Sequence, residues 1–419
     1  MNELATLWAE WLRPSAGLPT VQWSMLLAVA TVVGYLFQRY SGLPKVLGYS
    51  LVGTVAGLAG FNGALWPLQG TGLFLLELGV AIVLFEAGGR IPLRWFRHNP
   101  MVLVQSIAES TLTYFAVYWL LRYFDMPVYV AGPLAIVAMV ASPAVLTRVV
   151  ADTQASGPVT DRALVLSTLG SLYALTLGAA QAGLLHRPQH TPWDAFYPVA
   201  VVLGVSIAVG GLLALALRTA LRFMSPSSEN TSILLLALIS AAATIAAHLG
   251  GSAPLAALLG GMLLKQISPR PWSWPRQMGT AASLLTMMMF VLVSTVAAQA
   301  DWSAPVTGLV VALIAARAIA KVAGVALGNV GSGASWKQAL WVGAAMSPMS
   351  SIALLIVSQF MTASPAVGEE IARVALPAIL LMEVLGAMVA TLAVYRAGES
   401  SKPWLPGSQA TNTGERRAP

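Results

Sequence analysis

The hydrophobic pattern of this chain is a succession of long apolar runs, broken by proline, glycine and charged residues. A run of about 20 apolar residues is long enough to cross the hydrocarbon core of a bilayer as a helix. The two shortest runs are the second and the ninth. The pattern predicts thirteen spans, near residues 22–40, 46–61, 71–89, 101–122, 128–149, 162–185, 195–217, 231–248, 253–268, 280–299, 304–328, 337–360 and 372–395.

The segments outside these spans are short. Residues 1–21 place leucine and tryptophan on one helical face before a proline, which predicts an interfacial segment lying on the membrane surface. Residues 22–396 form the predicted transmembrane domain. Residues 397–419 are polar and are expected to be a disordered cytoplasmic tail.

Composition agrees with a membrane location. Hydrophobic residues make up 57% of the 419 residues and charged residues only 9%, whereas a soluble domain carries about 25% charge. A water-soluble globule is therefore excluded, and the sequence predicts an all-α polytopic membrane protein embedded in a lipid bilayer. The absence of cysteine excludes disulfides and thiol chemistry.

The basic residues predict the orientation. If the N-terminus is outside, the outer side carries only Arg13, Arg122, Arg187 and Arg373, and the other loop lysines and arginines are cytoplasmic. Cytoplasmic loops carry the excess of Lys and Arg in membrane proteins. We therefore expect a multi-pass protein of the inner membrane, with its N-terminus outside and its C-terminus in the cytoplasm. This placement accounts for the net charge of +7 without a nucleic-acid partner.

Two of the apolar runs carry a Ser-Pro pair near their centres. Ser142-Pro143 lies in the fifth span and Ser347-Pro348 in the twelfth. A proline inside a helix removes a backbone hydrogen bond, and the freed carbonyls need partners within hydrocarbon. Seven spans separate the pairs, so the two segments run in opposite directions. This predicts two inverted repeats whose broken helices cross near the bilayer centre, where transporters bind their cargo. The alternative is two unrelated kinks.

Several stretches together resemble one family. They are, in order, "LLELGVAIVLFEAGGRIPLRWFRHNP", "MVASPAVLTRVVAD", "GGSAPLAALLGGMLL", "AARAIAKVAGVALG", "MSPMSSIALLIV" and "LPAILLMEVLGAMVA". This ordered set is similar to the monovalent cation/proton antiporter superfamily. The resemblance implies the sodium/proton antiporter fold of about thirteen helices, an elevator mechanism and a homodimer, with no cofactor. It also implies a moving core of about residues 101–185 and 304–395, with the other spans as scaffold.

The sequence departs from this family in the sixth span. Family members carry one or two acidic residues midway along it, and the matching stretch here is "VLSTLGSLYALTLG", with Gly170-Ser171 at the acidic position. The Ser171 hydroxyl could coordinate a cation, but it could not exchange that cation for a proton. If protons are carried, another group must bind them.

Four charged residues remain well inside predicted spans: Glu109, Arg317, Lys321 and Glu383. A charge at a helix centre costs about 2.5–3.5 kcal/mol on the insertion scale, so each needs a partner or a function. Arg317 and Lys321 are predicted to be a charge clamp, with Arg317 paired to Glu109 or Glu383. The two glutamates are candidates both for clamps and for proton carriers, and we expect Glu109 to be the less tightly paired of the two.

Two further patterns have simple structural interpretations. Glu86 precedes Arg90 and Arg94 at the inner end of the third span, and an interfacial ion pair is expected there. Gly53 and Gly57 form a GxxxG pattern in the second span, which indicates close helix packing.

The sequence therefore predicts a secondary active transporter that exchanges Na⁺ or K⁺ for protons. Its predicted ion-binding residues are Ser142, Pro143, Ser171, Ser347 and Pro348, and no metal is expected beyond the transported cation. The alternative is a degenerate relative that acts as a uniporter, a channel-like leak or a non-transporting protein, because the acid of the sixth span is missing. No nucleophile–base pair suggests an enzyme.

Overall fold

The computed structural model describes residues 18–403 except 62–63, 65, 92, 186–191, 226–227, 269–275 and 301. Most of the predicted N-terminal interfacial segment, residues 1–17, lies outside the described residues, as does the tail from residue 404. Residues 18–21, which were assigned to that segment, belong to the first described helix.

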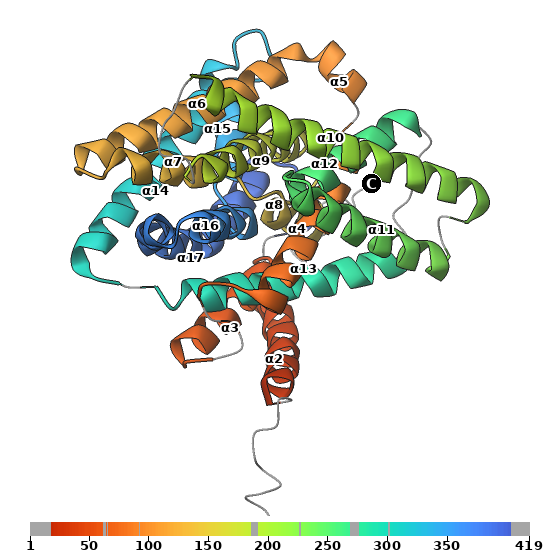
Figure 1. Cartoon of the computed structure of the whole chain (residues 1–419), viewed down its shortest axis with the longest axis horizontal. Coiled ribbons are helices and arrows are strands. Elements are labelled where there is room, and N and C mark those ends of the chain that lie inside the picture. The colour runs from red at the N-terminus through yellow and green to blue at the C-terminus, as the bar shows by residue number, and fades with distance from the viewer. Residues whose placement is uncertain are drawn as a thin grey trace, which may run out of the picture.

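The described residues are helical and form no sheet, apart from one isolated bridge between Ala155 and Ser400. The helices in chain order are α2 (Leu18–Ser41), α3 (Lys45–Leu58), α4 (Gly70–Gly89), α5 (Leu93–His98), α6 (Pro100–Tyr123), α7 (Val128–Met139), α8 (Pro143–Thr153), α9 (Pro158–Leu184), α10 (Pro192–Phe223), α11 (Glu229–His248), α12 (Ala253–Ile267), α13 (Arg276–Ala297), α14 (Ala304–Leu327), α15 (Trp336–Ala345), α16 (Ser351–Ala363) and α17 (Pro365–Arg396) (Figure 1).

The predicted spans correspond to these helices in order. The fifth span is the pair α7 and α8, the twelfth is the pair α15 and α16, and α5 is a short helix in a loop. Among the described residues, 8 helical segments are long and apolar enough to cross a membrane, and four shorter apolar helices accompany them. The chain is therefore a multi-pass, all-helical membrane protein, as predicted. The expected short second and ninth spans are α3, with 14 residues, and α12, with 15.

Both Ser-Pro pairs interrupt their helices. Helix α7 ends at Met139, and α8 begins at Pro143, where the fixed φ of proline suits a first helical position and its missing N–H is not needed. Ser142 caps α8 by accepting a hydrogen bond from Val145 N at 3.4 Å. In the other pair, Pro348 lies in the non-helical segment between Ala345 and Ser351.

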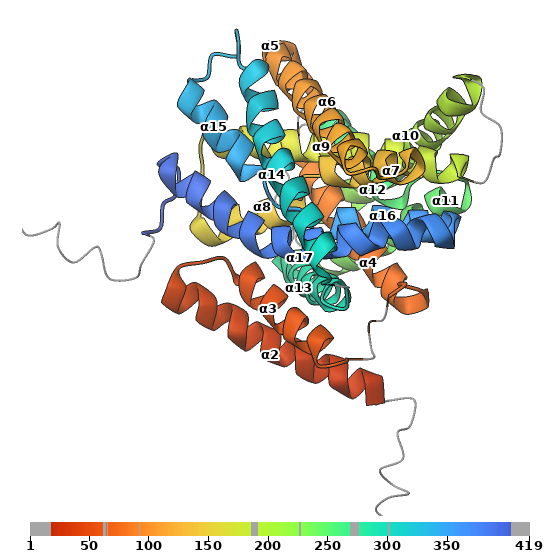
Figure 2. The ribbon, with the colours of Figure 1, turned by 90° about the vertical axis from the view of Figure 1, so that its left-hand side faces the viewer.

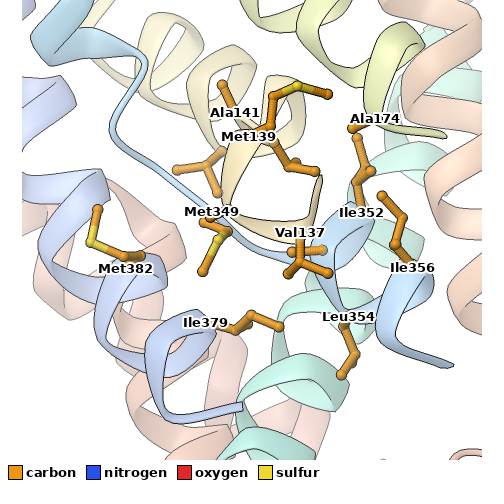
Figure 3. Packing of buried hydrophobic residues seen from close by; sticks show 14 of the residues in the cluster. Val137, Met139, Ala141, Ala174, Met349, Ile352, Leu354, Ile356, Ile379 and Met382 are labelled. Atoms are coloured by element: carbon orange, nitrogen blue, oxygen red, sulfur yellow. The ribbon is translucent and has the colours of Figure 1, made fainter. Parts of the chain in front are cut away.

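The two breaks cross each other. Ser142 N donates a hydrogen bond of 2.8 Å to Pro348 O, so backbone from one break pairs directly with backbone from the other. Buried apolar side chains of both broken helices and of α17 surround the crossing, among them Val137, Met349 and Ile379 (Figure 3). The prediction of two opposed, broken helices that meet is confirmed.

Helices α2 and α3 form a pair at one side of the bundle, and α13 lies between them and the other helices (Figure 2). Helix α3 approaches α13 very closely. A Cβ atom added at Gly53 would lie 2.5 Å from Val291 O, and one at Gly57 would lie 2.4 Å from Thr295 O. The interpretation of this GxxxG pattern as close packing is therefore confirmed.

The start of the predicted tail is ordered. Glu399 accepts hydrogen bonds from the backbone N–H groups of Val159 and Thr160, at 2.8 and 2.7 Å. A carboxylate at this place satisfies free N–H groups at the start of α9. The residues just after α17 are thus attached to the helical domain, contrary to the expectation of disorder from residue 397.

The close packing of α3 predicts the effect of one added methyl group. We expect Gly53→Ala to lower the apparent melting temperature in detergent, because overpacking costs about 1–3 kcal/mol and the gain in helix propensity is at most about 1 kcal/mol. The matched control is Gly204→Ala, since a Cβ at that helical position meets nothing within 4 Å. An unchanged or raised melting temperature for Gly53→Ala would contradict the observed helix spacing.

Candidate functional site

Arg317 of α14 is fully buried and binds backbone carbonyls from both breaks. Its guanidinium donates from Nε to Ala138 O at 2.8 Å and from Nη2 to Val140 O at 2.5 Å, both at the end of α7. It also donates from Nη1 to Ser347 O at 2.6 Å and from Nη2 to Pro348 O at 3.4 Å. A positive charge is favourable at helix C-termini, where carbonyls lack intrahelical partners. The predicted pairing of Arg317 with Glu109 or Glu383 is wrong, because its donors are directed to these carbonyls.

Lys321, one turn further along α14, pairs with Glu109 of α6. The Nζ–Oε1 distance is 2.5 Å, and the same ammonium donates to Met139 O at 3.1 Å. Both side chains are buried, with 1% and 0% exposure. Close packing brings them together, because a Cβ at Gly324 would lie 2.4 Å from Glu109 Cα. The expectation that Glu109 is the less tightly paired glutamate is therefore wrong.

Glu109 has two further partners on its own helix. Ser110 Oγ donates to Oε2 at 3.2 Å, and Thr113 Oγ1 donates to Oε1 at 3.3 Å. Its carboxylate is thus surrounded by an ammonium and two hydroxyls. Removing its charge would leave the buried Lys321 ammonium without a counter-charge.

Glu383 of α17 has a different environment. It is completely buried, and Ser50 Oγ of α3 donates to its Oε1 at 3.1 Å. The hydroxyls of Ser294 and Ser350 face the same carboxyl group, but neither completes a well-formed hydrogen bond, and Oε2 has no partner. No ion pair joins Glu383 to any residue in the described part of the chain. Its neighbours are therefore neutral hydroxyl groups.

The residues at the acidic position of the sixth span lie beside Glu109 and the first break. A Cβ at Gly170 would lie 3.7 Å from Ser110 Oγ and 3.9 Å from Glu109 Oε2. Ser171 Oγ lies 3.1 Å from Ala141 O and 2.8 Å from Ser167 O, to both of which it can donate. The carboxyl group beside Gly170-Ser171 is thus that of Glu109, which belongs to α6 and not to the sixth span.

The crossing brings most of the predicted ion-binding residues together. Ser142 contributes its N–H to Pro348 O, and Ser171 reaches the first break through Ala141 O. Ser347 takes part through its carbonyl, which accepts from Arg317. Pro143 starts α8.

Other predicted or overlooked residues lie elsewhere. Glu86 pairs with Arg90 at 2.6 Å at the end of α4, so the expected interfacial pair is confirmed. Ser50, Ser294 and Ser350 were not predicted from the sequence, because single serines in apolar helices are common. The one available signal was that Ser50 lies three and seven residues before Gly53 and Gly57, on the face that packs most closely.

Comparison with known proteins adds a family and a fold. The family model described as "Sodium/hydrogen exchanger, transmembrane" matches residues 27–395. A structure of the sodium proton antiporter MjNhaP1 from Methanocaldococcus jannaschii at pH 8 is similar, with a TM-score of 0.68 and 15% identity over 90% of this chain and 98% of that chain. An electron-microscopy structure of the same antiporter gives a TM-score of 0.70 and 15% identity over 92% and 98%. A search of curated proteins finds no match.

The carbonyl contacts of Arg317 predict a large loss of stability for Arg317→Ala. Each buried carbonyl that loses its donor costs about 1–3 kcal/mol, and several would lose it together. Arg317→Lys should destabilise less, because the lysine ammonium keeps the positive charge, although it lacks the planar array of donors of the guanidinium. Thermal unfolding in detergent measures both effects, and Arg39→Ala is the control, since Arg39 is exposed. Equal stability of Arg317→Ala and the wild type would refute the role of these contacts.

The Glu109–Lys321 pair predicts non-additive stability effects. Glu109→Gln alone should destabilise by about 3–5 kcal/mol, because it leaves a buried ammonium without its counter-charge. The double variant Glu109→Gln/Lys321→Met should recover much of this loss. A double-mutant cycle of unfolding free energies tests this pair, and simple additivity of the two single effects would contradict it.

Proposed function

Because this chain belongs to the sodium/hydrogen exchanger family, we propose that it exchanges a monovalent cation, Na⁺ or K⁺, for protons across the membrane. We propose an elevator movement of a core made of α6–α9 and α14–α17 against a scaffold made of α2–α4 and α10–α13. The fold shared with a sodium proton antiporter supports this division, as does the crossing of the broken helices inside the core.

The single observation that carries the proposal is the environment of Glu383. This buried carboxyl group has hydroxyl neighbours and no ionic partner among the described residues. Such a group can gain or lose a proton without leaving a second buried charge uncompensated. Glu109 cannot, because neutralising it would isolate Lys321. We therefore assign proton binding to Glu383 and a structural role, as part of the charge clamp with Arg317 and Lys321, to Glu109.

The location of Glu383 fits alternating access. It belongs to the proposed core, whereas its hydrogen-bond donor, Ser50, belongs to the proposed scaffold. A movement of the core would separate the two and carry the carboxyl group with it. Ser142, Pro143, Ser171, Ser347 and Pro348 would support the ion path at the crossing.

Membrane placement and assembly are part of the same proposal. The distribution of Lys and Arg supports an inner-membrane protein with its N-terminus outside and its C-terminus cytoplasmic. We propose a homodimer with its contact in the scaffold. Helix α2 offers apolar side chains there that face away from the rest of the chain, including Met25, Val29 and Val32.

One observation favours a second function. The usual acidic position of the sixth span holds Gly170-Ser171, and a chain that cannot bind protons would conduct cations without coupling. This alternative, a uniporter or channel-like leak, predicts cation movement that does not move protons.

Exchange by purified protein in proteoliposomes, followed with a pH-sensitive dye, tests the proposal. We expect the wild type to couple proton movement to Na⁺ or K⁺, and Glu383→Gln to abolish the coupling because an amide cannot be protonated in the working pH range. The control is Glu86→Gln, whose carboxyl pairs with Arg90 at a helix end. Persistent coupling in Glu383→Gln would move the proton site elsewhere. Cation flux without proton movement in the wild type would favour the leak.

A further inference from the structure

Three helical elements that are far apart in the sequence bring hydroxyl groups to one buried carboxyl group. Ser50 belongs to α3 and Ser294 to α13, and Ser350 is the residue that directly precedes α16. All three hydroxyls face Glu383 of α17. Each of the four side chains is 0% exposed. The group lies where the proposed core meets the proposed scaffold.

This cluster contains polar atoms without hydrogen-bond partners. They are Glu383 Oε2, Ser294 Oγ and Ser350 Oγ, and the hydroxyl of the neighbouring Ser351 is also unpaired. Buried polar side-chain atoms in native proteins nearly always have a partner, so an unpaired group at one place requires an explanation. Buried oxygen atoms that converge and lack hydrogen-bond partners can coordinate a bound cation.

Ser350 shows that one of these hydroxyls is not used by its own helix. A serine at an N-cap position usually accepts a hydrogen bond from the first turn of its helix. Ser142 does so at the start of α8. Ser350 holds the equivalent position before α16 but makes no side-chain capping bond, and its hydroxyl faces the Glu383 carboxyl group instead.

The chemistry of this set favours an alkali cation. Its four side chains offer only carboxylate and hydroxyl oxygens, which are hard ligands suited to hard cations. A single carboxylate balances a single positive charge. Zinc, copper, nickel and iron favour nitrogen or sulfur ligands, and the divalent ions Ca²⁺, Mg²⁺ and Mn²⁺ would require more negative charge or bound water.

We propose that Glu383, Ser50, Ser294 and Ser350 form a binding site for a dehydrated monovalent alkali cation. This inference rests on the proposed function and extends it, because it places cargo binding at the contact between core and scaffold. None of its four residues comes from the sixth span, which holds Gly170-Ser171.

Close helix packing holds the walls of this site in place. A Cβ at Gly53 would lie 2.9 Å from Ser294 Cβ, so α3 and α13 touch where they present their serines. A Cβ at Gly386 would lie 2.6 Å from Pro348 Cα, so α17 touches the second break one turn from Glu383. Such rigid contacts reduce the ordering cost of ligand binding.

A cavity of about 570 Å³ lies between the residues that follow α13 and the first turns of α17. Gln299, just after α13, and Glu369, Glu370 and Leu376 of α17 are among its lining residues. Leu376 precedes Glu383 by seven residues, which is about 10 Å along a helix. Arg373 also lines the cavity, but the two glutamates outnumber it, and a net negative charge raises the local concentration of cations.

Direct cation binding tests the site without depending on transport. Purified protein in detergent is titrated with NaCl, LiCl or KCl against choline chloride at constant ionic strength and pH, while thermal unfolding is followed. A ligand that binds only the folded state raises the melting temperature with its concentration. We expect at least one of the three alkali cations to stabilise the wild type and choline to have no effect.

Variants then locate the site. Ser50→Ala, Ser294→Ala and Ser350→Ala should each weaken the apparent cation affinity by about tenfold, and Glu383→Gln should abolish the stabilisation. The matched control is Ser358→Ala, because this buried serine donates to Leu354 O of its own helix at 2.9 Å and should leave the affinity unchanged.

Two outcomes would overturn the site. One is unchanged cation affinity in all three serine variants. The other is an absence of cation stabilisation in the wild type. If Glu383→Gln also has a lower melting temperature in choline, Glu383 is instead a structural counter-charge for the N-terminus of α16.

The site and the proposed exchange can fail separately. Wild-type cation affinity in the triple serine variant, with proton exchange intact, would refute the site and leave the function standing. Affinity lost in the variants, with no proton exchange by the wild type, would support the site and refute the function.

Discussion

The contact between Arg317 and the two broken helices is the constraint on which the other features depend. Each break exposes carbonyls in a region where water cannot satisfy them, and such groups are costly to leave unpaired. One guanidinium binds carbonyls from both breaks and is itself fully buried. The C-terminal end of a helix carries about −0.5 charge, so two ends that face the same guanidinium roughly balance its charge. Arg317 therefore needs no carboxylate.

This balance determines how the acidic groups are used. Because backbone carbonyls compensate Arg317, Glu109 is left to neutralise Lys321. The second glutamate, Glu383, remains without an ionic partner in the described part of the chain and lies against α3 and α13. Four buried charges thus become one closed pair, one carbonyl-bound cation and one carboxyl group that a mobile cation or a proton can neutralise.

Small residues decide where these groups meet. Gly324 allows α14 to touch α6 at Glu109, Gly53 allows α3 to touch α13 at Ser294, and Gly386 allows α17 to touch the second break. At each contact a polar side chain lies within a turn of the glycine. In a membrane the hydrophobic effect does not drive helices together, because the lipid tails are equally apolar. Helix association therefore relies on close van der Waals contact at small residues. The same seams that hold the bundle together therefore position its polar groups.

The sequence by itself determined the spans, the two breaks and the set of buried charges. These features are local: the length of an apolar run, the missing N–H of a proline and the cost of a charge in hydrocarbon all act at one position. It could not determine the partners. Arg317 and Lys321 lie one turn apart on a similar face of the same helix. Only the packing of α14 against α6 and the breaks determines that Lys321 pairs with Glu109 and that Arg317 binds the backbone carbonyls. The hydroxyls around Glu383 come from three separate elements, and single serines carry no signal of where they point until the helices pack. Tertiary structure decided this site, because its geometry depends on contacts between residues that no sequence spacing relates.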